Sequence, residues 1–258
     1  MLRVLNNAFD HPLKIEENAV MPLAGGIMQN GYQCGMLWGA TLSAGAHAYR
    51  NCGNNIEAEM MAMKAAKKLV DTFQNMHGEI NCYEITDINR SSSYLKMFYV
   101  FLIKGKTFGC FNMAAKYAKA AFNEINSIHC DQYTDTPSQP VSCTAELARK
   151  AGLSEMHIAM AAGLAGGIGL CGGACGALGA AIWIYGMKVL KRGGSNVDYN
   201  DTGALNLIDS FLKVNDYKFE CAEIVGRKFE NIDDHATFLS KSGCADNIDM
   251  LASQLASI

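Results

Sequence analysis

The chain has 258 residues, of which 50% are hydrophobic and 18% are charged, and its formal net charge is −3. This composition excludes a disordered chain, and the length allows one large core or two smaller ones. Without a basic block, nucleic acid is not an expected partner. The start of the chain contains no apolar run followed by a cleavage site, so we expect a cytoplasmic protein whose ten cysteines are mostly thiols or metal ligands.

The elements predicted along the chain are helices. Residues 19–49 form an uncharged, glycine-containing stretch, and residues 56–73 place apolar side chains on one face at helical spacing. Residues 94–103 are ambiguous, because they also fit a strand. The segments around Cys110 and Cys244 each put a cysteine on the apolar stripe of a helix, directly after a glycine. We therefore predict an all-α fold.

A second uncharged stretch, residues 159–187, is long enough to cross a membrane. Both uncharged stretches are rich in glycine rather than leucine, and the first includes Gln29, Asn30 and Gln33. A helix buried in a protein core is also apolar on every side. We therefore interpret both stretches as buried helices, and association with a membrane is not expected.

An internal repeat is the most specific signal in the sequence. Shifting the chain by 141 residues places AGGIMQNGYQCGMLWGA, residues 24–40, on AGGIGLCGGACGALGAA, residues 165–181. Farther along, INCYEIT falls on FECAEIV, and GKTFGCFNMAAKYAKAAF falls on LSKSGCADNIDMLASQLA. Three cysteines thereby recur in the same order: Cys34, Cys82 and Cys110 fall on Cys175, Cys221 and Cys244.

The repeat predicts two homologous halves, residues 1–128 and 141–258, joined by a polar linker over residues 129–140. Two similar halves in one chain can pack about a pseudo-two-fold axis, as the subunits of a homodimer do. The chain itself is a possible homo-oligomer.

The recurring cysteines are candidates for a chemical role. A buried cysteine often packs only as a small hydrophobic residue. Packing alone, however, would let alanine, serine or valine replace it in one half, and these six positions keep their cysteines. The halves contain no CxxC pair, which argues against a zinc ribbon and a thioredoxin-type motif.

The dense glycines allow two explanations. Each glycine in a helix interior costs about 1 kcal/mol relative to alanine, so the run needs a structural or functional reason. One reason is close approach of helices; the other is close approach of backbone N–H groups to a cluster or ligand. The glycines that flank the cysteines are the candidate cofactor-binding positions: Gly31, Gly35, Gly172 and Gly176.

Each half resembles the C-GCAxxG-C-C family of redox-active proteins. Its pattern is a glycine run ending in CGAxxG, a cysteine opening a short C-x-[DE]-[IL] step, and a cysteine on the final helix. The second half reads CGALGA, with Ala180 replacing the last glycine, then CAEIV and GCADNIDML; the first reads CGMLWG, with Met36 replacing alanine, then CYEIT and GCFNMA. The resemblance covers most of the chain as a tandem pair.

The resemblance also implies a cysteine on a helix ahead of the glycine run. Cys143 is the nearest match in the second half, whereas the matching position in the first half lies near Leu2, where no cysteine occurs. Three alternatives follow for the first half: it has lost the ability to bind a cluster, Cys52 or Cys130 supplies the fourth ligand, or a residue other than cysteine does. Cys171 and Cys175 are spaced to share one helical face, so Cys171 is a further candidate.

We therefore predict a redox protein that holds a [2Fe–2S] or [4Fe–4S] cluster through cysteine thiolates and exchanges electrons with a redox partner protein. The metal-ligand candidates are Cys175, Cys221, Cys244, Cys143, Cys34, Cys82, Cys110 and Cys171. No paired acid–base groups point to a catalytic residue.

Two alternatives stay open at this point. The first is a thiol–disulfide enzyme or sensor in which the same cysteines cycle without metal. The second is a structural or membrane-associated subunit that uses its glycine-rich helices for packing.

Overall fold

The computed structural model describes residues 1–52, 55–130 and 140–258. Over these ranges the regular elements are helices, together with two isolated bridges, Gln33 to Asn81 and Ala174 to Glu220. The all-α prediction is therefore confirmed. Most of the predicted linker, residues 131–139, lies outside the described residues.

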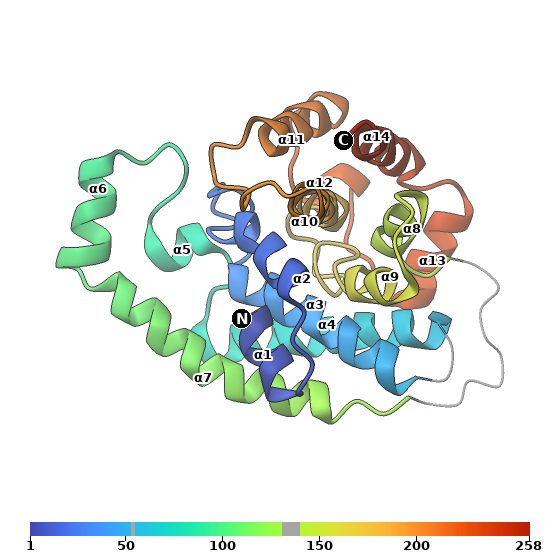
Figure 1. Ribbon diagram of the computed structural model, residues 1–258, viewed down its shortest axis with the longest axis horizontal. Helices are drawn as coiled ribbons and strands as arrows, with labels where there is room; N and C mark the ends of the chain where they lie inside the picture. The colour runs from blue at the N-terminus through green and yellow to red at the C-terminus, as the bar shows by residue number, and fades with distance from the viewer. Residues whose placement is uncertain (53–54, 131–139) are drawn as a thin grey trace.

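The two halves have their α-helices in the same order, and the first half has two additional short elements, η1 and η2 (Figure 1). The first half contains α1 (Leu2–Ala8), α2 (Lys14–Ala19), the 3-10 turn η1 (Met21–Leu23), α3 (Gly35–Asn51), α4 (Asn55–His77), α5 (Cys82–Thr86), α6 (Tyr94–Phe98), the π-helix η2 (Tyr99–Ile103) and α7 (Lys106–Asn126). The second contains α8 (Cys143–Lys150), α9 (Glu155–Ala162), α10 (Gly176–Lys191), α11 (Thr202–Val214), α12 (Cys221–Val225), α13 (Ile232–Ser240) and α14 (Ala245–Ala256). The ambiguous segment 94–103 is thus helical.

The glycine runs are loops, and their prediction as continuous buried helices is wrong. Helices α3 and α10 begin only after the runs, at Gly35 and Gly176. Within the runs, several residues adopt positive φ, including the non-glycines Ile27 and Ile168. A Cβ on Gly26 would lie 2.2 Å from the backbone nitrogen of Tyr32, so only glycine fits there. The loops therefore fold back tightly on their own backbone.

The halves meet through positions that are equivalent in the repeat. Glu16 and His157, which are 141 residues apart, pair through Oε1 and Nε2 at 2.7 Å. A Cβ on Gly179 would meet the ring of Trp38, its counterpart, at 2.2 Å. Contacts between equivalent positions are what the predicted pseudo-two-fold axis would produce.

Gln33 joins the two glycine loops. Its side chain is buried; Nε2 donates to the carbonyl of Gly167 at 3.0 Å, and Oε1 accepts from the N–H of Ala174 at 3.0 Å. Gly173 leaves the space that this amide fills, because a Cβ there would lie 2.0 Å from Nε2. One side chain from the first half thereby satisfies backbone groups of the second half.

The central helices carry the core. Trp38 of α3 and Trp183 of α10 are fully buried, and α3 packs on both α4 and α9. In Figure 1, α3 and α10 lie near the centre, α7 runs along one side, and α6 stands at the end away from α8 and α14. Among the described residues, no helix has the length and apolar character needed to cross a membrane.

Replacing Gln33 by alanine should lower the free energy of unfolding by about 2–4 kcal/mol, because the Gly167 carbonyl and Ala174 N–H would stay buried without partners. Urea denaturation followed by circular dichroism measures this loss. Gln74→Ala, on the exposed face of α4, is the matched control and should leave stability nearly unchanged. Equal effects of both substitutions would contradict the role given to Gln33.

Candidate functional site

Four cysteines of the second half come together from four separate elements. Cys143 is the first residue of α8, Cys175 directly precedes α10, Cys221 begins α12, and Cys244 directly precedes α14. The pKa of Cys143 is raised well above its usual range, because the thiol is buried and because Cys244, Cys221 and Cys175 lie within electrostatic reach. The predicted ligand set of this half is therefore clustered.

Backbone pairing holds two of these cysteines beside each other. The Cys175 N–H donates to the carbonyl of Phe219 at 2.9 Å, and the Cys221 N–H donates to that of Gly173 at 2.7 Å. The bridge forms because the end of the glycine loop is extended, as is the residue before α12. These two backbone hydrogen bonds hold Cys175 of the loop beside Cys221 of the helix.

The first half repeats this bridge. Here the Cys34 N–H donates to the carbonyl of Ile80 at 2.8 Å, and the Cys82 N–H donates to that of Tyr32 at 2.7 Å. The pKa of Cys34 is raised to about 12, chiefly by burial and also by the nearby Cys82 and Cys110. The predicted three cysteines of this half are thus also gathered together.

Backbone N–H groups face the sulfurs in the second half. The N–H of Gly166 faces Cys143, and those of Ala177 and Leu178 face Cys175, where each lowers the pKa of the thiol. Burial is the larger influence, so the pKa of each thiol stays above its usual value. Of the two explanations for the glycine run, approach of N–H groups to a sulfur therefore applies at Gly166.

Close packing accounts for the four candidate cofactor-binding glycines. Gly35 and Gly176 lie against the backbone of Ala24 and Leu164, at 2.8 and 1.8 Å from where a Cβ would stand. Gly31 and Gly172 have positive φ and face residue positions on α5 and α12 that are equivalent in the repeat. A cofactor contact by these glycines stays a prediction.

The first half lacks a fourth cysteine at its site. The N-terminal residue of α1 is Leu2, which is equivalent to Cys143 and is fully buried. Cys52 and Cys130 are bonded to each other in a disulfide at the far end of α3 from Cys34. The alternative that either of them completes the first set is therefore wrong; the other eight cysteines are free.

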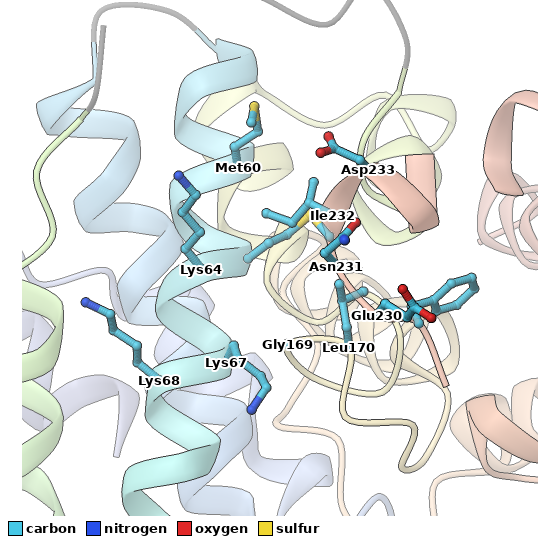
Figure 2. Close-up of a pocket in the computed structure, with 12 residues that line it drawn as sticks. Met60, Lys64, Lys67, Lys68, Gly169, Leu170, Glu230, Asn231, Ile232 and Asp233 are labelled. Atoms are coloured by element: carbon cyan, nitrogen blue, oxygen red, sulfur yellow. The ribbon is translucent and has the colours of Figure 1, made fainter. Parts of the chain in front are cut away.

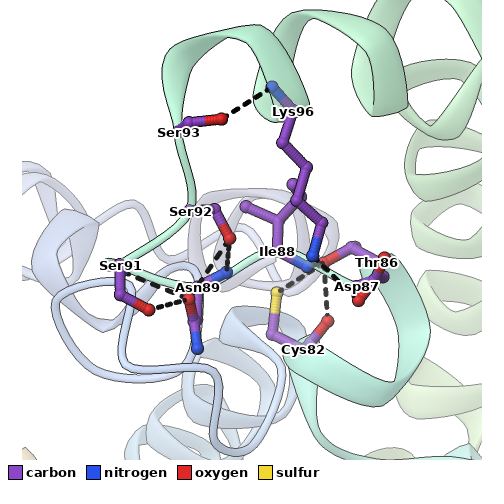
Figure 3. A network of polar contacts seen from close by, with 9 residues as sticks. All are labelled: Cys82, Thr86, Asp87, Ile88, Asn89, Ser91, Ser92, Ser93 and Lys96. Atoms are coloured by element: carbon purple, nitrogen blue, oxygen red, sulfur yellow. Dashed lines mark hydrogen bonds and ion pairs between the residues drawn. The ribbon is translucent and has the colours of Figure 1, made fainter.

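A threonine takes part in the first site. The Thr86 hydroxyl donates to the Cys82 carbonyl at 2.7 Å, and its oxygen lies 4.0 Å from the Cys82 sulfur (Figure 3). The same hydroxyl accepts from the N–H of Ile88, so it closes the turn after α5. Val225 stands at this position in the second half, so the two sites differ in polarity.

Cys171 does not join the second set. It lies in the glycine loop, so the helical face predicted for Cys171 and Cys175 is wrong. Its sulfur donates to the carbonyl of Gly169 at 3.6 Å. Burial raises the pKa of Cys171, and the charges acting on it belong to Lys67, Asp71 and Lys228. A metal-binding role for Cys171 remains a prediction without support from this geometry.

A large cavity is lined by none of the clustered cysteines. It has a volume of about 590 Å³ and separates α4 from the segment that leads into α13 (Figure 2). Lys64, Lys67 and Lys68 line one side, and Glu230 and Asp233 line the other. Cavity volume would therefore not have located the cysteine sets, which the repeat identifies directly.

Sequence reasoning missed several features because they occur in one half only. The disulfide joins two cysteines that have no counterpart in the repeat, and Gln33 stands opposite an alanine. A smaller pocket beside Cys110 is lined partly by Lys116 and His77, and no sequence motif predicts it. His157 is a core histidine whose two ring nitrogens are hydrogen-bonded to Ser154 and Glu16.

The thiols are not arranged around a single ion. Within the ranges that the structure describes, no group of three or more His, Cys, Asp or Glu side chains is placed to hold a metal ion. The cysteines of each set are close enough to raise one another's pKa, as seen for Cys34 and Cys143.

In metal-free native protein, iodoacetamide should modify Cys110 and Cys171 well before Cys143 and Cys175. The reagent attacks thiolates, and a pKa raised by full burial leaves less thiolate and less access at about pH 8. Peptide mass spectrometry over time measures the order of modification. Equal rates for all four thiols would contradict the buried positions described above.

The family comparison accounts for both cysteine sets. The family described as "Putative redox-active protein (C_GCAxxG_C_C)" matches residues 1–144 and again residues 136–258. Comparison with curated proteins and with solved structures gives no match. The two matches together span the chain, and each contains one glycine loop and one cysteine set. The protein therefore belongs to the C-GCAxxG-C-C family of redox-active proteins and carries two copies of the family's unit in tandem.

Proposed function

We propose that the protein transfers electrons through an iron–sulfur cluster held in its second half by Cys143, Cys175, Cys221 and Cys244. The observation that carries this proposal is the gathering of four thiols from four separate elements in one buried region. Both [2Fe–2S] and [4Fe–4S] clusters take four thiolate ligands. Four sulfurs from rigid helix starts suit that requirement better than packing alone does.

The chemistry of the donor set supports a metal centre. Four adjacent thiolates repel one another in a buried site, and the pKa of Cys244 is raised to about 12 by burial and by Cys175. Bound iron would supply the positive charge that favours the thiolates and the electron that is exchanged.

Backbone groups would tune such a centre. The N–H groups of Gly166, Ala177 and Leu178 already face two of the sulfurs. Hydrogen bonds to thiolate sulfur help to set the reduction potential of a cluster, and burial excludes water from it. The chain's contribution to electron transfer is therefore ligation, N–H donation and a low-dielectric surrounding, with a separate protein as donor or acceptor.

The thiol–disulfide alternative is less suited to this set. An attacking cysteine needs a thiolate, which a lowered pKa provides. Burial instead raises the pKa of Cys143, Cys175 and Cys221. The neighbouring charges that shift the pKa of Cys143 and Cys221 belong to other cysteines, which raise it further from the value that exchange requires. The glycines serve packing as well as the site, so the packing alternative describes part of the same architecture.

Anaerobically prepared full-length protein should contain iron and inorganic sulfide and show sulfur-to-iron charge-transfer absorption. Cys143→Ser, Cys175→Ser, Cys221→Ser and Cys244→Ser should each remove most of that absorption, because each deletes one of four ligands. Iron and sulfide analysis together with visible spectra measures the loss.

Cys171→Ser is the matched control, because this half-buried thiol lies in the same loop and donates to the carbonyl of Gly169. It should keep the absorption, and circular dichroism checks that all variants fold. Colourless, iron-free protein after anaerobic reconstitution would contradict the proposal.

A further inference from the structure

A pocket of about 430 Å³ opens beside Cys110 in the first half. Its walls come from the end of α4, from α5 and from the first turns of α7. This volume lies within the range of small-molecule sites. Of the clustered cysteines, Cys110 belongs to the set that lacks a fourth member, since Leu2 stands where Cys143 stands in the other half.

The pocket is positively charged. Lys106 and Lys116 line it, and its lining includes no acidic residue among those described. The Lys106 ammonium donates to the carbonyl of Ile85 at 2.7 Å, which keeps its charge at the pocket wall. Lys106, Cys110, Met113 and Lys116 recur at helical spacing, so one face of α7 presents two cations and the thiol together.

A polar atom in the pocket lacks a partner. The Nε2 atom of His77 is buried and has no hydrogen-bond partner among the described residues. His77 packs edge-on against Phe73 with ring centroids 4.8 Å apart, which fixes the ring at the end of α4. The amide of Asn112 lines the same pocket. Lys106, Lys116 and the amide of Asn112 offer partners to a ligand that carries anionic and polar groups.

We propose that this pocket binds a small anionic disulfide and that Cys110 exchanges with it. The carboxylates of such a molecule match Lys106 and Lys116, and its sulfur–sulfur bond meets the one thiol that lines the pocket. The proposal concerns the first half and does not depend on a cluster in the second.

The exchange conserves atoms, protons and electrons. Burial raises the pKa of the Cys110 thiol as well, but the Lys106 ammonium opposes that rise, which no lysine among the described residues does for Cys143, Cys175 or Cys221. The thiol releases its proton to water, and its sulfur attacks one sulfur of the ligand disulfide. The bond between the ligand's two sulfurs breaks, a bond from Cys110 to one of them forms, and the other leaves as a thiolate that takes up a proton. Cys110 is oxidised to a mixed disulfide, and one half of the ligand is reduced to a thiol.

The experiment compares two disulfides on the full-length protein. Oxidised glutathione carries carboxylates, whereas cystamine is cationic and lacks them. Mass spectrometry of peptides gives the rate of mixed-disulfide formation at Cys110 with each. The expected result is faster reaction with oxidised glutathione, and Lys106→Gln and Lys116→Gln should each reduce the ratio of the two rates by about fivefold.

Lys119→Gln is the matched control, because Lys119 lies on the same helix but lines a different pocket, near Val4 and Phe122. It should leave the ratio unchanged, and Cys110→Ser should abolish the adduct. Adducts formed at Cys34 or Cys82 in place of Cys110 would overturn the proposal, as would ratios that do not respond to Lys106→Gln and Lys116→Gln. Iron and sulfide content measured on the same variants tests the cluster proposal separately, so either proposal can fail without the other.

Discussion

The backbone bridge between the glycine loop and the short helix that follows is the constraint on which both sites depend. In each half, two N–H groups of cysteines donate to carbonyls across the bridge, so the sulfurs start from fixed backbone positions. The loop that leads into each bridge folds back on itself through residues of positive φ. Glycine at Gly26 and Gly167 makes that fold possible, and the cysteine geometry follows from it.

The cysteine sets were predictable because duplication marks them, whereas the loop conformation was not. An uncharged, small-residue stretch fits a buried helix as well as a tight loop, and only the left-handed backbone at residues such as Ile168 distinguishes them. Helix α4 was predictable because its apolar side chains recur at helical spacing. Gln33 and the disulfide of Cys52 and Cys130 were not, since neither recurs in the other half.

The two halves have kept one framework and changed what lies around it. The second half has Cys143 and Val225 at positions where the first has Leu2 and Thr86. These differences leave the second set with four thiols, and the first with three thiols and a nearby hydroxyl. Duplication allows this divergence, because the shared backbone bridge maintains the fold while single side chains alter the chemistry.

The contacts between the halves also use residues that differ between the two copies. Glu16 and His157 descend from one position of the repeat yet now form a complementary pair at 2.7 Å. Gln33 similarly fills a space that Gly173 leaves open. Two glutamates or two histidines could not form the Glu16–His157 pair, so this contact depends on a difference between the two copies. Asymmetry at the interface and asymmetry at the cysteine sites are therefore two results of joining the copies in one chain.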